Sequence, residues 1–158
     1  MTDEHDDPLA THRDIAASRS RVWEVLADGW TYSQWVVGNS RMRDVDPTWP
    51  APGSKIHHSI GVWPVVINDV TISEECVPEQ RLVLLAKSGP LGAARITLTL
   101  RDIEGGCQVA MSEVPVSGPA AWVPDKLALL AIKPRNKECL WRLASLAQGR
   151  DRTGGGSG

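Results

Sequence analysis

Apolar and polar residues alternate strictly through the middle of the chain. In residues 94–101 the apolar positions are Ala94, Ile96, Leu98 and Leu100, and the polar ones are Arg95, Thr97, Thr99 and Arg101. A period of two places successive side chains on opposite faces of a strand. Residues 55–62, 65–76, 81–87 and 107–115 continue the series, with short connections that contain Gly or Pro. The pattern predicts antiparallel hairpins in one sheet with one buried face.

Two short helices are predicted before these hairpins. After a possible strand at residues 11–16, Ser18 is suitably placed as the N-cap of a helix that ends near Asp28. Thr31 and Gln34 have the spacing of a reciprocal capping box, which predicts a second short helix.

A long helix is predicted from about Pro124 to Gln148, with Gly149 placed to cap it. Pro134 lies inside this segment and predicts a kink or break near Lys133, because proline lacks the backbone N–H and clashes with the preceding turn. The expected fold class is therefore α+β. The long helix is the only predicted element with the length to cover the buried face of the sheet.

The composition fits one globular domain. The chain has 158 residues, of which 42% are hydrophobic and 23% charged, and its formal net charge is −2. Without a basic surplus, nothing indicates a nucleic-acid partner. The longest apolar run, residues 127–132, is far shorter than the ~20 residues that cross a bilayer, and the acidic start does not resemble a signal peptide. We therefore expect a cytoplasmic protein without a membrane span.

The predicted domain spans residues 11–149. Residues 1–10 are expected to form a flexible acidic tail, and residues 150–158 a flexible Gly/Ser tail that resembles an artificial linker. The chain has seven Trp, one Tyr and no Phe. Drift in a GC-rich genome and deliberate engineering both account for this usage, and the sequence does not separate them.

No cofactor or metal motif is visible. The three cysteines are widely spaced and form no CxxC or Cys/His cluster, so neither a disulfide framework nor a zinc site is predicted. His57 and His58 are adjacent in a predicted strand and point to opposite faces, so they do not form a chelating pair.

Several local segments resemble the Bet v 1/START-like (SRPBCC, polyketide cyclase/dehydrase-like) superfamily, especially actinobacterial members. These segments are Ile15–Ser18 followed by Val22–Asp28, Trp35–Gly38, Trp49–Ser54, His57–Gly61, and Arg135-Asn136 with Leu140, Arg142 and Leu143. The resemblance implies a helix-grip fold, in which a curved antiparallel sheet of six to seven strands wraps around a long C-terminal helix. It also implies an elongated apolar cavity between sheet and helix. After Gly61 and Val62 the superfamily pattern implies a small residue, whereas this chain has Trp63.

His58 is the first candidate for chemistry. Its neighbours two positions away, Ile56 and Ile60, are apolar, so its ring is expected to face the interior. A desolvated imidazole is neutral at physiological pH and suits a general base or a hydrogen-bond donor. The alternative is a core histidine that bonds a backbone carbonyl.

Glu113 is the second candidate. The inward register of the last strand places its carboxylate at the rim of the cavity, where it would pair with a cation, a ligand or His58. The alternative is a solvated carboxylate near the strand end.

Other cavity positions are assigned from the alternation and the resemblance. Of Asn68 and Asp69, one must face inward, and the pattern does not decide which. Arg135 and Asn136 are expected to cap carbonyls freed by the proline or to face the cavity. The residues assigned to the cavity are Trp35, Ile60, Trp63, Asp69, Leu84, Leu98, Met111, Trp122, Leu130 and Asn136.

Four functional hypotheses follow. The first is a binding protein, monomeric or homodimeric, for a small hydrophobic, lipid- or polyketide-like molecule, because an apolar cavity with few polar groups suits binding. The second is a polyketide cyclase- or dehydratase-like enzyme that uses His58 and Glu113 as acid/base groups. The third is an interaction with an acidic partner through the basic segment 124–152, and the fourth is a catalyst engineered on this scaffold.

Overall fold

A computed structural model describes the backbone of residues 4–154 and the side chains of residues 5–149. The predicted tail residues 1–3 and 155–158 lie outside the described residues. The strands are β1 (Thr11–Ile15), β2 (Asn39–Val45), β3 (Lys55–Val62), β4 (Val65–Val77), β5 (Arg81–Lys87), β6 (Ala93–Ile103) and β7 (Gly106–Ser117). The helices are η1 (Glu4–Asp6), α1 (Arg19–Ala27), η2 (Gly29–Thr31), α2 (Tyr32–Trp35), η3 (Gly89–Leu91), η4 (Pro119–Trp122) and α3 (Asp125–Gly154).

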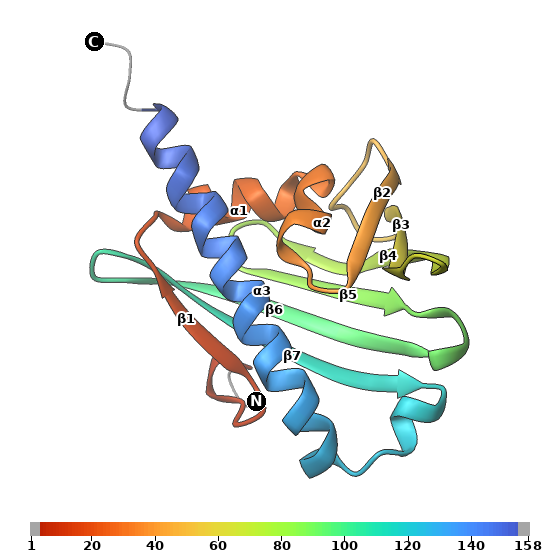
Figure 1. Cartoon of the computed structure of the whole chain (residues 1–158). Coiled ribbons are helices and arrows are strands. Elements are labelled where there is room, and N and C mark those ends of the chain that lie inside the picture. Colours follow the sequence, from red (N-terminus) through yellow and green to blue (C-terminus); the bar gives the residue numbers. More distant parts are fainter. Residues whose placement is uncertain (1–3, 155–158) are drawn as a thin grey trace.

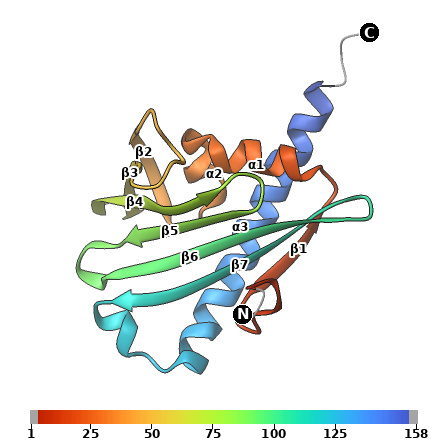
Figure 2. The same ribbon diagram turned by 180° about the vertical axis from the view of Figure 1, so that it is seen from behind.

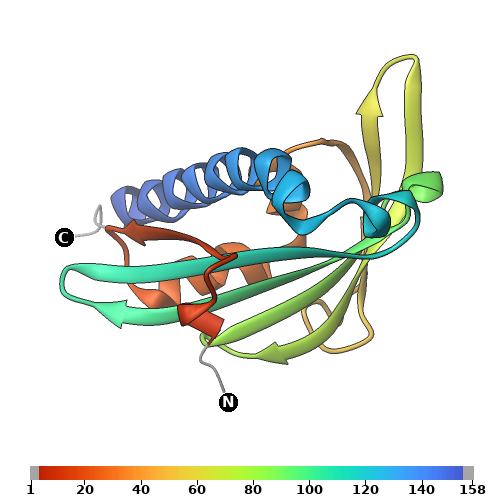
Figure 3. The same cartoon turned by 90° about the horizontal axis from the view of Figure 1, so that it is seen from below.

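The strands form one antiparallel sheet in the order β1-β7-β6-β5-β4-β3-β2. Helix α3 crosses one face of this sheet, with α1 and α2 beside it (Figure 1). Seen from behind, α3 lies beyond the sheet (Figure 2), and the opposite face is contacted by the short η1, whose His5 Nδ1 is 2.8 Å from the Thr99 hydroxyl. From below, the sheet is strongly curved, and the β3–β4 hairpin bends toward the side on which α3 lies (Figure 3). The predicted α+β helix-grip fold is confirmed.

The core lies between the sheet and the second half of α3. Its largest sheet side chains come from alternate positions, as the period of two predicts. The fully buried members include Leu82, Leu84, Ile96, Leu98 and Met111 from the sheet, Val22 and Val25 from α1, and Leu140, Leu143 and Ala147 from α3. These residues form one hydrophobic cluster.

Helix α1 begins as predicted. The side chain of Ser18 accepts a hydrogen bond from the backbone N–H of Arg21 (3.2 Å). The predicted capping box at α2 is wrong, because Thr31 caps no N–H. Its hydroxyl instead contacts the carbonyl oxygens of Val25 and Asp28 at 2.8 and 2.9 Å.

Helix α3 differs from the prediction at two points. It continues through Pro134 without a break, and it ends at Gly154 rather than at Gly149. Its first half is largely exposed: Leu130, expected in the cavity, is 73% exposed. The helix therefore contributes to the core mainly after Pro134.

Candidate functional site

A pocket of about 250 Å³ opens between β3, the end of β5, the α2–β2 loop and α3. Apolar and polar side chains contribute to its wall. The lining residues are Tyr32, Val36, Val37, Gly38, Asn39, His58, Ile60, Ala86, Lys87, Ser88, Glu113 and Arg135. Of the residues assigned from the sequence, His58, Glu113 and Ile60 line this pocket.

His58 lies at the end of a buried hydrogen-bond chain. Its Nε2 is 2.9 Å from the hydroxyl of Thr71, which is itself 3.0 Å from the hydroxyl of Tyr32. The alternation of β3 and β4 explains this arrangement, because Thr71 pairs with Ile56 and so shares the face on which His58 lies. The Tyr32 ring also lies against the imidazole, with 5.6 Å between the ring centroids.

Burial controls the ionisation of both ends of this chain. The His58 side chain is 2% exposed, and desolvation lowers its pKa to about 4, so the imidazole is neutral at physiological pH. Desolvation also raises the pKa of Tyr32 to about 12. The other ring nitrogen of His58, Nδ1, is buried and has no hydrogen-bond partner among the described residues.

Glu113 pairs with Arg135 rather than with His58. Arg135 Nη1 donates to Glu113 Oε2 at 2.6 Å, and Arg135 Nε donates to the carbonyl oxygen of Val37 at 3.1 Å. Burial raises the pKa of Glu113, and the Arg135 guanidinium partly offsets that rise. Within the described part of the chain, no hydrogen bond joins His58 to Glu113, so the pairing considered from the sequence is absent although both residues line one pocket.

The α2–β2 loop forms one side of the pocket and is held to α3. In addition to the Arg135 contact, the Val37 N–H donates to Cys139 Sγ at 3.4 Å. Gly38 then takes a positive φ of 96°, which turns the chain into β2. The next residue, Asn39, pairs with Ile60 and therefore shares the face of His58. Its Oδ1 is buried and has no partner among the described residues.

The register resolves the choice between Asn68 and Asp69. Asp69 pairs with His58 and lies on the same face of the sheet, whereas Asn68 is exposed. Asp69 is not part of the pocket wall. Its carboxylate instead accepts the N–H of Gly89 and so holds the β5–β6 connection.

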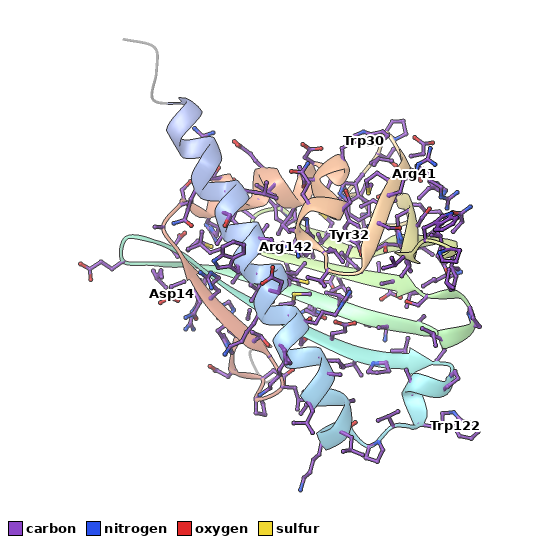
Figure 4. The ribbon with its side chains drawn as sticks, in the orientation of Figure 1. Asp14, Trp30, Tyr32, Arg41, Trp122 and Arg142 are labelled. Carbon is purple, nitrogen blue, oxygen red and sulfur yellow. The ribbon has the colours of Figure 1, made fainter. Side chains whose placement is uncertain are left out.

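The other positions assigned to the cavity fall into two groups. Trp35, Leu84, Leu98, Met111 and Asn136 are buried; all but Asn136 belong to the hydrophobic cluster, and none of the five lines this pocket. Trp63 and Trp122, at the turns that precede β4 and α3, are 84% and 89% exposed. Figure 4 shows Trp122 at the margin of the molecule, whereas Tyr32 lies at α2.

Sequence reasoning missed several residues of the site. Neither Tyr32 nor Thr71 was among the residues assigned to the cavity. For Arg135 the sequence left two alternatives, capping of backbone carbonyls or a position facing the cavity, and its ion pair with Glu113 was not predicted. Asn39 carried no signal, because β2 lacks the alternating pattern and was not predicted.

The described part of the chain has neither a cluster of metal ligands nor a membrane-spanning helix. Residues 4–154 contain no group of three or more His, Cys, Asp or Glu side chains suited to a metal ion. Over the same residues, no helix has both the length and the apolar character needed to span a bilayer.

Comparison with known structures supports the fold. Protein NE0264 from Nitrosomonas europaea superposes with a TM-score of 0.69 at 17% identity, covering 90% of this chain and 94% of the other. The di-domain ARO/CYC StfQ from the steffimycin biosynthetic pathway gives 0.69 at 10% identity, covering 90% of this chain and 50% of its own. Ara h 8.0201 gives 0.68 at 9% identity, covering 89% and 96%. At these identities the likeness concerns the fold alone.

Sequence comparison gives a family. The search of curated proteins finds no match. Residues 16–148 match the family model described as Activator of Hsp90 ATPase homolog 1-like protein, which covers most of the predicted domain. The chain therefore belongs to the Activator of Hsp90 ATPase homolog 1-like protein family, within the SRPBCC superfamily that the sequence motifs indicated.

Proposed function

We propose that this protein binds a small, largely apolar molecule, lipid- or polyketide-like, whose polar end enters the pocket beside His58. The SRPBCC fold is known for ligand binding and for polyketide cyclase roles. The observation that carries the proposal is a pair of buried polar atoms, His58 Nδ1 and Asn39 Oδ1, which have no protein partner and belong to residues of one pocket. A buried polar atom without a partner raises the free energy of the protein, and a ligand that pairs with it recovers that free energy.

The two atoms also define the polar end of the ligand. Asn39 Oδ1 only accepts hydrogen bonds, so it selects a donor such as a hydroxyl. When His58 Nε2 accepts from Thr71, its Nδ1 carries the proton and selects a carbonyl or hydroxyl oxygen. A volume of about 250 Å³ is just below the ~300–1,000 Å³ of common ligand pockets. The pocket therefore suits a compact molecule or one end of a longer one.

Native mass spectrometry of gently purified protein, followed by denaturing extraction, tests binding. A stoichiometric organic adduct is expected, and a clean apo mass counts against a tightly bound ligand. A titration with 2-naphthol and naphthalene then tests the polar end. The hydroxyl compound should bind about fivefold more tightly, as one hydrogen bond of about 1 kcal/mol implies.

Two variants test whether the pocket causes the preference for 2-naphthol over naphthalene. Asn39→Ala should remove the preference for 2-naphthol, whereas Ser40→Ala, an exposed residue of β2 outside the pocket, should keep it. Equal binding of both compounds by the unaltered protein would show that the polar atoms do not select the ligand.

A second candidate function is catalysis of a cyclase or dehydratase type on a polyketide-like ketone. It is favoured by the unpartnered ring nitrogen of His58 at the pocket, which a bound substrate could reach. His58 would act as the acid or base, and Glu113, held by Arg135, would stabilise positive charge or orient the substrate. The molecule extracted from the protein distinguishes binding from catalysis, because a binding protein releases its ligand chemically unchanged. An enzyme converts an added β-polyketone, and His58→Gln abolishes conversion while binding remains.

Further expectations from the sequence stay predictions. These are the cytoplasmic location, an actinobacterial source and a monomeric or homodimeric state. Light scattering of the purified protein measures the last of these.

A further inference from the structure

A second hollow, of about 500 Å³, lies between β1 and α3. It is lined by Ala10, Thr11, His12, Lys133, Pro134 and Lys137, and it shares no residue with the pocket around His58. Figure 3 shows β1 running alongside α3 on the side of the sheet that the helix covers. The hollow is therefore a separate feature of the molecule.

The hollow is lined by two basic side chains, those of Lys133 and Lys137. Lys133 and Lys137 are four residues apart and so lie on the same side of α3. Among the residues whose side chains are described, neither lysine forms an ion pair, and no acidic residue belongs to the lining. Ala10 and Pro134 add apolar surface to the lining, as do the methylene groups of the lysines.

Thr11 supplies a polar group inside the hollow. Thr11 pairs with Met111, a core residue, so its side chain lies on the face of the sheet that α3 covers. The residue is 8% exposed, and its Oγ1 is buried without a hydrogen-bond partner among the described residues. Buried hydroxyls are usually paired, so this one is available to a ligand.

We infer that this hollow binds an amphiphilic organic anion, with a carboxylate or phosphate head group and a short apolar body. The two ammonium groups and the Thr11 hydroxyl hold the head group, because charge-assisted hydrogen bonds to oxyanions are the strongest that these side chains form. The apolar walls receive the body. This site is independent of the proposed function of the first pocket.

Calorimetric titration of the full chain tests the inference with octanoate, octyl phosphate, inorganic phosphate and octanol. We expect octanoate or octyl phosphate to bind, with an affinity that falls as salt rises, and octanol to bind at least about tenfold more weakly. Comparison of the two anionic amphiphiles identifies the head group. Inorganic phosphate shows how much of the affinity the head group alone provides. Octanol that binds as tightly as the anions overturns the inference, and so does the absence of binding by every probe.

Variants place the ligand in one site or the other. Lys133→Ala/Lys137→Ala should weaken binding about tenfold or more, and the near-isosteric Thr11→Val about fivefold. Lys126→Ala, in the first turn of the same helix but outside the hollow, should leave the affinity unchanged. If Asn39→Ala abolishes binding and the lysine variant does not, the probe occupies the first pocket and the inference is wrong. That result leaves the proposed function standing.

Discussion

At the scale of single residues, His58 shows how burial determines chemistry. Its imidazole has one hydrogen bond, to Thr71, and is otherwise surrounded by the Tyr32 ring and the strands around it. Ionising it would place a charge on a residue that is only 2% exposed, and this desolvation lowers its pKa to about 4. The neutral ring is therefore maintained by its position in the fold.

This pKa predicts how stability depends on pH. The unfolded chain binds the His58 proton at about pH 6.5, whereas the folded protein binds it only near pH 4. The unfolded state therefore holds more protons between these values, and the folded state loses about 3 kcal/mol as pH falls through this window. Urea unfolding at intervals from pH 7 to pH 4 measures the loss, and His58→Gln should remove most of it.

The control for this prediction is Lys55→Gln, an exposed residue on the opposite face of β3, which should keep the pH dependence of the unaltered protein. The raised pKa of Glu113 acts in the opposite sense, lowering stability as pH rises above about 4.5. The difference between the His58 variant and the unaltered protein isolates the histidine. An unchanged slope in His58→Gln would contradict the assignment.

At the scale of elements, α3 is joined to the pocket rim by the side chain of Arg135. This guanidinium contacts both Glu113 on β7 and the backbone of the α2–β2 loop at Val37. Cys139, one turn later, contacts the same loop residue. The loop therefore takes its position from the helix as well as from the strands.

Arg135→Ala should destabilise the protein by about 2 kcal/mol, because it leaves the Glu113 carboxylate buried without its cation. Arg142→Ala is the matched control. Arg142 pairs with Glu138 on the exposed surface of the same helix, so its loss should cost about 0.5 kcal/mol. Denaturant unfolding compares the two variants. The double variant Arg135→Ala/Glu113→Gln should recover part of the loss, and equal costs for the two single variants would count against a buried pair.

The β3–β4 hairpin depends on a glycine. Gly61 has a φ of 105°, and a Cβ at this position would overlap the carbonyl oxygen of Val65. Gly61→Ala should therefore cost about 3 kcal/mol or more. Gly105 has a φ of 82° with no atom within 4 Å of the added Cβ, so Gly105→Ala should cost only about 1 kcal/mol. Thermal unfolding compares them, and a cost for Gly61→Ala no larger than that for Gly105→Ala would refute the steric argument.

The elements that the sequence predicted correctly are those with a strong local pattern. The alternation around Ile96 predicted β6, and Ser18 predicted the start of α1. Strand β2 could not be found, because Met42 and Val45 are its only apolar residues and its pairing with β3 is irregular. The end of α3 was wrong because Gly149 tolerates a helical conformation when the helix continues.

At the scale of the whole molecule, the pocket is smaller and more polar than the apolar cavity expected from the resemblance. His58 and Glu113 were found because their neighbours at two residues distance are apolar. The surrounding residues were not, since the register of the sheet brings Thr71 to His58 and Asn39 to the pocket, and Arg135 reaches the pocket from α3. Alternation also does not show whether a residue at the end of a strand faces the cavity or the solvent. Trp63, which was assigned to the cavity, lies in the turn between β3 and β4 and is exposed.

The packed interior predicts unequal costs for two residues assigned to the cavity. Met111→Ala should destabilise the protein by about 2–5 kcal/mol, because Met111 is fully buried in the core. Trp63→Ala should change stability by no more than about 0.5 kcal/mol, since the indole is exposed. Chemical denaturation measures both. A large cost for Trp63→Ala would mean that its side chain packs against the protein.

The strand order has a consequence for the order in which the chain folds. β1 pairs only with β7, which follows it by about a hundred residues, and such distant pairing slows folding. During synthesis, β1 therefore has no strand partner until more than two thirds of the chain exists. The hairpins of β3 to β7 have meanwhile left their apolar face uncovered, because α3 comes last. A nascent chain therefore remains prone to associate with other chains until α3 has been synthesised and covers the apolar face of the sheet.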